Sequence, residues 1–413
     1  MFRKFTGLWR HADFLRLWSG QTISVFGSMV GGAAMSFTAI LALGATPFQM
    51  GVLNATQLVP GFLAGLFAGA WVDRVRRRPL LIGADLGRAL VLATIPLAAL
   101  LRILRIEQVY LVALVVSILS IIFNVAYQSY LPSLIGKEDL LDGNSKLSAS
   151  AAVAEFGGFS IAGWLVQALT APFAILIDAA SFGVSALTLG LIRRREPPAA
   201  PPAGRPSLGR EISEGLKAVL EQPLLRASAA AMLAHELAGG MYGALVVLYM
   251  SRGLGFNPGL LGMIWAVGGA SSFIGAALAP RFTARLGFGP TLAAGLGVAG
   301  LTSLLIPLAS GATLLSAALL AGAQLGDGFY TVYEINEVSL RQGIAPEGVL
   351  GRVNATFQFI SLGSALAGSL AGGALGEALG TRPVLVIGAG GTLLAALYLA
   401  FSPICRLKEA PLA

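Results

Sequence analysis

Long apolar runs separated by short polar segments dominate this sequence of 413 residues. Each run is about 20 residues long or longer, which is enough for a helix to cross the hydrocarbon core of a bilayer. We predict twelve spanning helices, at residues 14–43, 50–72, 80–103, 108–130, 146–168, 171–192, 223–250, 259–281, 288–310, 312–340, 350–376 and 381–403. The pattern therefore indicates an all-α membrane protein that crosses the bilayer many times.

The first span follows a basic segment, residues 1–16, and must be distinguished from a signal peptide. A signal peptide has a shorter apolar region and a cleavage site of small residues. We therefore predict that the first span is retained as a helix and that the N-terminus is cytoplasmic.

Composition and charge support this class of protein. The chain is 56% hydrophobic, and its mean hydropathy is +0.78. The net charge of +8 comes from basic residues between the spans, so it indicates membrane orientation and not a nucleic-acid partner. Of the 28 lysines and arginines, 23 fall in segments on one side of the membrane and 4 in the opposite loops. Because basic loops stay in the cytoplasm, we predict a multi-pass protein of the inner (plasma) membrane with both termini cytoplasmic.

A proline-rich, charged linker divides the sequence. Residues 196–221 contain too many prolines and charges to span a membrane, so they separate an N-terminal bundle, 1–195, from a C-terminal bundle, 222–413. Within the linker, residues 208–220 predict a short amphipathic helix on the cytoplasmic surface. Its apolar face would consist of Leu208, Ile212, Leu216 and Val219.

The two halves repeat each other at a nearly constant offset. Four matches are displaced by 211 residues: Pro47 with Pro258, Gly51 with Gly262, Arg74 with Arg285, and Pro79 with Pro290. A repeat of this kind predicts two pseudosymmetric six-helix bundles.

A charged loop after the second span carries a specific motif. It reads Gly69-x-x-x-Asp73-Arg74-x-x-Arg77-Arg78 and, together with twelve spans in two halves, it resembles the major facilitator superfamily. Three further motifs are similar to the exporter branch that includes siderophore and macrolide efflux proteins (enterobactin-exporter-like): Leu17-Trp-Ser-Gly-Gln21, Asp85-Leu-Gly-Arg88 and Gly351-Arg-Val-Asn354. The resemblance implies the major facilitator fold and transport by alternating access.

The resemblance also implies a role for the charged loop. In the family arrangement, Asp73 would lie against the start of the eleventh span, near Arg352, and Arg77 against the cytoplasmic end of a neighbouring helix. A carboxylate is stabilised at a helix N-terminus, so the loop would act as a conformational latch between the bundles. The latch residues are Gly69, Asp73, Arg74, Arg77, Arg78 and Arg352. In the alternative interpretation, the arginines only fix the orientation in the membrane.

Acidic residues inside the spans are the strongest functional signals. A charge at the bilayer centre costs about 2.5–3.5 kcal/mol on insertion scales, so each acid must face a cavity or a partner. The candidates for proton coupling are Glu155, Asp178, Glu236, Asp327 and Glu334. Two further acids have an arginine one helical turn away and are predicted to form ion pairs: Asp85 with Arg88, and Glu337 with Arg341.

Polar residues form stripes on two repeat-related spans. A helical period places Gln324, Asp327, Tyr330, Glu334, Glu337 and Arg341 on one face of the tenth span. The corresponding face of the fourth span consists of Ser117, Ser120, Asn124 and Tyr127. These stripes predict a central cavity, to which other spans add Trp164, His235, Tyr242, Trp265 and Tyr333. An aromatic and polar cavity suits a bulky, partly apolar compound better than a sugar.

These features predict a secondary transporter that expels a drug-like or siderophore-like amphiphile while protons flow inward. Glu236 is the favoured proton carrier, because Gly239, Gly240 and Gly243 share its face and leave room beside the carboxylate. The same glycines could instead serve close helix packing. Asp327 is the second candidate.

Other functions were weighed against this prediction. An uncoupled facilitator or importer fits the same architecture, because the direction of transport is not written in the sequence. An intramembrane hydrolase or acyltransferase would need a nucleophile motif near His235, and none is present. A non-transporting receptor would leave the ionisable cavity unexplained. The chain has no phosphate-binding loop and only one cysteine, so we expect no enzyme activity, cofactor or metal site. The expected partners are the substrate, protons and the lipid bilayer, with the chain as a monomer.

Overall fold

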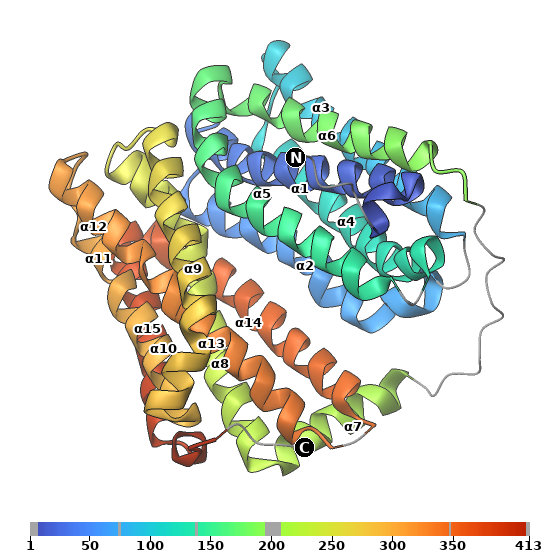
Figure 1. The fold of residues 1–413 in the computed structure, drawn as a ribbon. Helices are drawn as coiled ribbons and strands as arrows, with labels where there is room; N and C mark the ends of the chain where they lie inside the picture. The colour runs from blue at the N-terminus through green and yellow to red at the C-terminus, as the bar shows by residue number, and fades with distance from the viewer. Residues whose placement is uncertain (1–6, 73–75, 137–138, 195–207, 347, 410–413) are drawn as a thin grey trace, which may run out of the picture. The chain divides into compact units, whose positions relative to one another are not determined.

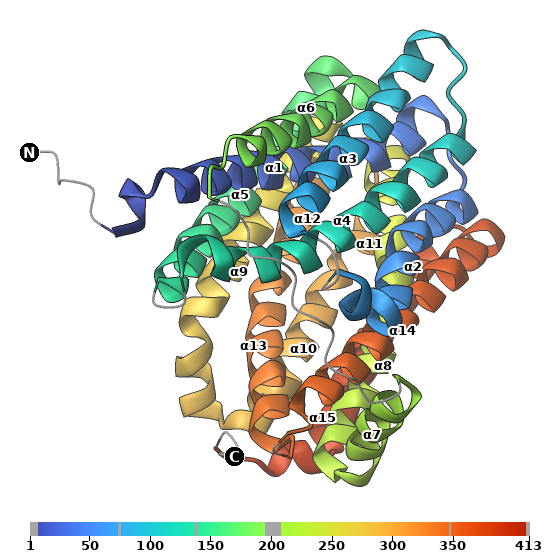
Figure 2. The same cartoon turned by 90° about the vertical axis from the view of Figure 1, so that its right-hand side faces the viewer.

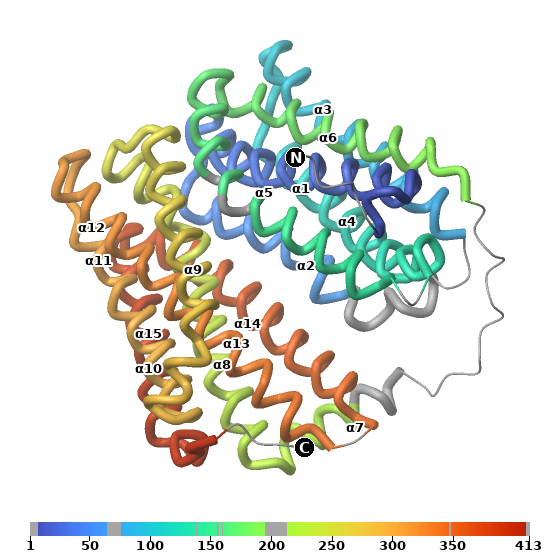
Figure 3. Tube along the Cα trace, in the orientation of Figure 1, coloured from blue at the N-terminus to red at the C-terminus, as the bar shows by residue number. Residues whose placement is uncertain are grey.

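The computed structural model describes residues 7–72, 76–136, 139–194, 208–346 and 348–409, without the side chains of 64–72, 155–156, 159 and 208–212 (Figure 3). All regular elements in this part of the chain are helical. The first half of the sequence forms η1 (Gly7–Arg10), α1 (Ala12–Phe37), η2 (Thr38–Ala42), α2 (Pro47–Val72), α3 (Arg77–Leu100), α4 (Ile106–Ile135), α5 (Leu140–Leu169) and α6 (Ala171–Gly190). The linker contributes α7 (Leu208–Glu221). The second half forms α8 (Pro223–Leu248), η3 (Tyr249–Gly253), α9 (Pro258–Leu286), α10 (Phe288–Ser303), α11 (Leu305–Leu308), α12 (Leu314–Gln324), α13 (Gly326–Ile344), α14 (Leu350–Leu379), α15 (Thr381–Phe401) and η4 (Pro403–Arg406).

Every predicted span overlaps at least one of these helices. Among the described residues, nine helical stretches are long and apolar enough to cross a membrane. The predicted ninth span is not one continuous helix, because it is interrupted at Leu304. Pro307 follows three residues later, and a proline ring cannot donate to the helical ladder at that point.

The predicted tenth span is also not continuous, and a side chain from α9 explains the interruption at Leu325. The hydroxyl of Ser271 donates to the Leu325 carbonyl oxygen at 2.8 Å and accepts from the Gly328 amide at 3.0 Å. A side chain that inserts into the hydrogen-bond ladder divides a helix. As a result, Asp327 lies in the first turn of α13.

The chain divides into two compact units. The first unit comprises Met1–Gly44 with Leu66–Arg205, and the second comprises Ala45–Gly65 with Pro206–Ala413. Within the first unit, α1 packs on α5 and α6, and α3 packs on α4 and α6. Within the second unit, α8 packs on α14 and α15, and α10 packs on α13 and α15, so the same pairs recur (Figures 1 and 2). The division into bundles 1–195 and 222–413 stays a prediction.

The repeat extends to details of the backbone. Helices α1 and α8 each end in a π-helical turn, η2 and η3, at positions 211 residues apart. Each turn is followed by a glycine with positive φ, 65° at Gly44 and 81° at Gly255. Glycine adopts such angles without a Cβ clash, so both halves use the same residue to leave the same turn.

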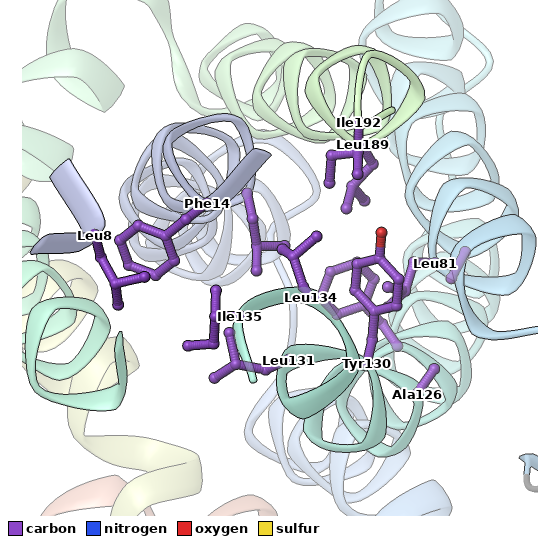
Figure 4. Packing of buried hydrophobic residues seen from close by; sticks show 13 residues of the cluster. Leu8, Phe14, Leu81, Ala126, Tyr130, Leu131, Leu134, Ile135, Leu189 and Ile192 are labelled. Atoms are coloured by element: carbon purple, nitrogen blue, oxygen red, sulfur yellow. The ribbon is translucent and has the colours of Figure 1, made fainter. Parts of the chain in front are cut away.

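The core of the first unit gathers side chains from η1, α1, α3, α4 and α6 (Figure 4). Phe14, Leu81 and Tyr130 are at most 2% exposed. Because lipid tails are as apolar as these side chains, close packing contacts hold such helices together more than the exclusion of water does. The second unit has two comparable clusters, one around Leu292 and one around Phe357.

Helix α7 confirms that the linker contains a helix, and it packs on α14. Val219 is 1% exposed, and Glu214 forms an ion pair of 2.6 Å with Arg352. Leu216 of the predicted apolar face is 45% exposed and does not pack on α14 as Val219 does, so the contact of this face with the membrane surface stays a prediction. Gly215 faces α14, since a Cβ added there would lie 2.6 Å from the carbonyl oxygen of Arg352.

Candidate functional site

A cavity of about 230 Å³ lies in the second unit between α8, α13 and α14. Its lining consists of Met232, His235, Glu236, Tyr330, Tyr333, Glu334, Glu337, Val338, Arg341, Phe357, Gln358 and Ser361. Two of the predicted proton-coupling acids, Glu236 and Glu334, therefore meet at the predicted cavity residues His235, Tyr330 and Tyr333. All these side chains belong to one unit, and Figures 1 and 2 show the three helices that carry them.

The predicted ion pair between Glu337 and Arg341 is confirmed, at 3.0 Å. Glu337 is 3% exposed and also accepts a hydrogen bond of 3.0 Å from Ser228 of α8. The Arg341 guanidinium lies 4.8 Å from the centroid of the Phe357 ring. A buried charge needs a partner of this kind, so these two charges balance each other at the edge of the cavity.

The carboxylates of Glu236 and Glu334 have a different environment. Glu236 is half-buried beside Ser361 of α14, while Glu334 is exposed. Among the described residues that line the cavity, Arg341 is the only lysine or arginine. The two carboxylates are thus accessible to whatever enters the cavity, including water and protons.

The glycines beside Glu236 combine the two roles that the sequence left open. A Cβ added at Gly240 would lie 2.3 Å from the carbonyl oxygen of Ala365, so this glycine permits close packing of α8 on α14. A Cβ added at Gly239 would meet nothing within 4 Å, so this position borders open space. At Gly243 the nearest atom is in ordinary contact.

An aromatic cluster forms one wall of the cavity. The ring centroids of His235 and Tyr330 are 5.2 Å apart, those of Tyr330 and Tyr333 are 5.9 Å apart, and those of His235 and Tyr333 are 6.3 Å apart. The Nδ1 atom of His235 lies 3.2 Å from the Thr392 hydroxyl, which fixes the ring against α15. The wall therefore places three aromatic rings in the same lining as the carboxylates.

Asp327 and Gln324 flank the interruption between α12 and α13 and do not line this cavity. A Cβ added at Gly268 of α9 would lie 2.2 Å from Asp327 Oδ2 and 3.0 Å from Gln324 Oε1. Both side chains therefore point at α9. Asp327 thus lies in the first turn of α13, on the side that faces α9.

Two further predicted cavity residues of the second unit also lie elsewhere. The Tyr242 hydroxyl donates to the Ser303 carbonyl oxygen of α10 at 3.0 Å. Trp265 is half-buried on α9. Neither residue lines the cavity of about 230 Å³.

The polar stripe of α4 lies in the first unit. Ser120 accepts a hydrogen bond of 3.2 Å from Arg88, and the Tyr127 ring stacks on Phe123 with centroids 6.0 Å apart. Ser117 is half-buried and Asn124 is exposed. Trp164 of α5 is 51% exposed. The structure thus gives Ser120 a structural partner and leaves the other residues of the stripe as candidates.

Asp178 belongs to a buried polar cluster of the first unit. It is 5% exposed, and its Oδ1 atom accepts from Ser28 at 3.2 Å and from Ser181 at 3.4 Å. The predicted pair of Asp85 and Arg88 is confirmed beside it and is also buried. The Arg88 guanidinium lies 4.0 Å from the Phe182 ring centroid. These groups join α1, α3 and α6.

The remaining candidates are only partly described. Glu155 lies in α5, but its side chain is outside the described part of the chain, and so are Asp73 and Arg74. Gly69 belongs to α2, and Arg77 begins α3. Arg78 donates to the carbonyl oxygens of Leu189 at 3.0 Å and Gly190 at 2.6 Å, at the end of α6. Arg78 thus contacts the C-terminus of α6, and the contact predicted for Arg77 stays a prediction.

The sequence analysis missed the contribution of α14 to the cavity. Gln358, Ser361 and Phe357 line it, as do Met232 of α8 and Val338 of α13. The signal was present, because Gln358 and Ser361 are polar residues one helical turn apart inside an apolar span. Together, the lining can bind and release protons at carboxylates and can bind a ligand through charge and ring faces. Among the described residues, no group of three or more histidine, cysteine, aspartate or glutamate side chains could hold a metal ion.

Comparisons with known sequences cover most of the chain. Residues 17–368 match the family profile described as Major Facilitator Superfamily. The chain is 26% identical over 325 residues to the uncharacterized MFS-type transporter YfiS of Bacillus subtilis (strain 168), covering 73% of this chain and 74% of that protein. It is 24% identical over 336 residues to the uncharacterized MFS-type transporter y4rN of Sinorhizobium fredii (strain NBRC 101917 / NGR234), covering 79% and 81%.

Solved structures show a similar fold. A bacterial homologue of the iron transporter ferroportin in the inward-facing state has a TM-score of 0.74 and 19% identity, covering 95% of this chain and 98% of that one. The nucleoside transporter NupG has a TM-score of 0.75 and 14% identity, covering 94% and 98%. At these identities the likeness concerns the fold alone.

Proposed function

Since the chain belongs to the major facilitator superfamily and is a membrane transporter rather than an enzyme, we propose that it exports an amphiphilic small molecule in exchange for protons. The observation that carries this proposal is the cavity at which Glu236 and Glu334 meet three aromatic rings. A carboxylate inside a membrane span costs free energy unless it faces a water-filled cavity or has a polar partner. Glu337 has its partner in Arg341, whereas Glu236 and Glu334 face the open cavity.

Glu236 is the proposed proton carrier. It lies in α8 with open space beside Gly239, so water and substrate can reach it. In an exchange cycle it takes up a proton when the cavity opens to the outside and releases it to the cytoplasm. Coupling requires that proton and substrate bind the two conformations with different affinities, because a ligand that binds both equally shifts nothing.

The other acids rank below Glu236 in this proposal. Glu334 shares the cavity and assists, while Asp327 faces α9 and does not line the cavity. Asp178 has two serine donors and lies in a sealed core, so it holds helices together more readily than it exchanges protons. Glu155 stays a reserve candidate.

The substrate must be found first. Growth rescue by this protein in a strain that lacks its own exporters, tested against drugs and siderophores, identifies a transported compound. The motifs around Leu17, Asp85 and Gly351 place the protein, in our proposal, in the exporter branch that includes siderophore and macrolide efflux proteins.

Proton coupling is then tested with the purified protein in liposomes. An imposed pH gradient should drive transport of that compound, and Glu236→Gln should abolish gradient-driven transport while exchange at equilibrium persists. Glu107→Gln is the matched control, because Glu107 is an exposed acid in the first turn of α4. Full gradient-driven transport by Glu236→Gln would assign the coupling to another acid. If the pH gradient does not affect transport by the unsubstituted protein, the protein is an uncoupled facilitator.

The proposed orientation places both termini in the cytoplasm of a monomeric protein in the inner membrane. Cysteine labelling tests it after Cys405→Ser has removed the single native cysteine. In intact cells, Arg76→Cys should be protected from an impermeant thiol reagent, and Arg102→Cys should react. Reaction at position 76 from outside would reverse the topology.

The proposed latch rests on the family motif, since Asp73 lies outside the described residues. If Asp73 favours one conformation by about 1–2 kcal/mol through a helix dipole, its loss changes the populations severalfold. Asp73→Asn should therefore lower turnover more than substrate binding, while Asp73→Glu should retain part of the rate. An unchanged rate with normal expression would remove the latch.

A further inference from the structure

The charged residues that line the cavity favour a positively charged ligand. Glu337 and Arg341 are paired at 3.0 Å, and Arg341 also lies 3.5 Å from the Asn354 side chain. Glu236 and Glu334 then leave the described lining with an excess of negative charge. An anionic ligand would add like charge in a partly dry site, where such charges repel strongly.

The aromatic wall also favours a positively charged ligand. Cations are attracted to ring faces when they lie within about 6 Å of a ring centroid. Tyr330, Tyr333 and His235 form a cluster with centroid distances between 5.2 and 6.3 Å. The Arg341 guanidinium, 4.8 Å from the Phe357 ring, shows that one ring of the lining already contacts a cation.

We propose that this cavity is a subsite for the cationic nitrogen group of the transported molecule, a protonated or quaternary amine. This inference rests on the proposed function, because it takes the bound molecule to be the transported one. The carboxylates of Glu236 and Glu334 neutralise the nitrogen group, and the faces of Tyr330 and Tyr333 enclose its alkyl substituents. The proposal excludes anionic catechol-type compounds as ligands of this site.

The size of the cavity limits what enters. At about 230 Å³ it is smaller than the pockets of roughly 300–1,000 Å³ that enclose drug-sized ligands. It holds the volume of roughly eight waters at about 30 Å³ each. The subsite therefore takes a head group, and the apolar part of the amphiphile lies outside it.

Three related probes test this subsite by ligand-observed NMR titration of the purified full-length protein in detergent, without an ion gradient. The probes are benzyltrimethylammonium, its uncharged carbon isostere neopentylbenzene, and the anion phenylmethanesulfonate. The ammonium should bind about tenfold more tightly than the isostere, the order expected for one screened charge contact, and the anion should not bind. Equal binding of the ammonium and its isostere, or no binding of the ammonium, would overturn the proposal.

Substitutions locate the subsite. Glu236→Gln and Glu334→Gln should each weaken ammonium binding by about tenfold and leave the isostere unaffected, whereas Glu107→Gln should change neither. Tyr330→Phe should retain binding, because it keeps the ring, and Tyr330→Leu should weaken it by roughly threefold. If neither glutamine substitution weakens ammonium binding, the proposed subsite is wrong, even if a pH gradient drives transport in liposomes. If the substitutions weaken ammonium binding but a pH gradient does not drive transport, the subsite is supported and only the proposed proton coupling is wrong.

Discussion

Acidic residues of the two units include examples in opposite environments, although the same helix pairs pack in both units. In the first unit, Asp85 is 0% exposed, and Arg88 and Asp178 are each 5% exposed. In the second unit, Glu236 and Glu334 border a cavity. A carboxylate with fixed partners in a dry core holds helices together, whereas one that reaches a cavity can exchange a proton or a ligand. Glu337 also lines the cavity but is paired with Arg341, so access to the cavity together with the choice of partner, and not membrane depth alone, distinguishes Glu236 and Glu334 from the paired charges.

The largest effect is expected from breaking the sealed pair of the first unit. Arg88→Met leaves the Asp85 carboxylate buried without its guanidinium, and removal of one partner of a buried ion pair costs about 3–5 kcal/mol. Thermal unfolding of the purified protein in detergent should show a large fall in the midpoint temperature. Transport should fall with the amount of folded protein.

The double variant Asp85→Leu with Arg88→Met is the control for this prediction. Removing both charges is less harmful than removing one, so much of the lost stability should return. Recovery will be partial, because Asp178 also interacts with the charge of Arg88. A single variant that unfolds at the temperature of the unsubstituted protein would contradict the structural role of the first unit's charges.

A smaller effect should separate two acids of the second unit. Glu337→Gln removes the partner of Arg341, whose side chain is only 14% exposed, and should cost about 1–3 kcal/mol of unfolding free energy. Glu334→Gln removes an exposed carboxylate and should change stability by less than about 0.5 kcal/mol. Glu337→Gln should thus lower stability more than Glu334→Gln does, whereas Glu334→Gln should lower gradient-driven transport more. Equal losses of stability would mean that Glu334 also has a structural partner.

The sequence predicts the fold well, because the signals for spans are long. Each span predicted from the apolar runs overlaps a helix of the structure. The major facilitator fold, which the 211-residue repeat also indicated, is confirmed. The interruption at Leu325 could not be predicted, since it depends on Ser271 of another helix. Local periodicity treats α12 and α13 as one helix, and only tertiary packing divides them.

The site was predicted less completely. Ion pairs one turn apart, such as Glu337 with Arg341, are written in the sequence of a single helix. Tyr242 donates to α10 and Asp327 points at α9, so a helical face alone could not exclude these residues from the cavity. Gln358 and Ser361 were missed because uncharged polar residues are a weaker signal in a span than acids.

Adjacent glycines provide a third prediction. Gly240→Ala places a Cβ 2.3 Å from the carbonyl oxygen of Ala365 and should cost about 1–3 kcal/mol through overpacking. Gly239→Ala meets open space and should be neutral or stabilise the helix by up to about 1 kcal/mol. The midpoint of thermal unfolding measures both.

The first unit offers the matching pair. A Cβ added at Gly31 of α1 would lie 2.1 Å from Asp178 Oδ2, whereas one added at Gly32 would meet nothing within 4 Å. Gly31→Ala should therefore destabilise and Gly32→Ala should not. Equal tolerance of alanine at Gly31 and Gly32 would show that the buried carboxylate can move, and would weaken the contrast between the units.

The smallest effect concerns the turns between α5 and α6 and between α14 and α15, which occupy equivalent places in the repeat. Thr170 has φ 66° and ψ 154°, and Gly380 has φ 87° and ψ 162°. Glycine adopts these angles freely, while a residue with a Cβ is strained there by about 1–3 kcal/mol. Thr170→Gly should relieve strain and, after the greater flexibility of glycine in the unfolded chain is subtracted, gain about 1 kcal/mol. Gly380→Thr should lose about 1–2 kcal/mol. The unfolding midpoints of the two variants should therefore move in opposite directions, and a loss of stability in Thr170→Gly would mean that the threonine side chain makes a contact in the first unit that has no counterpart in the second.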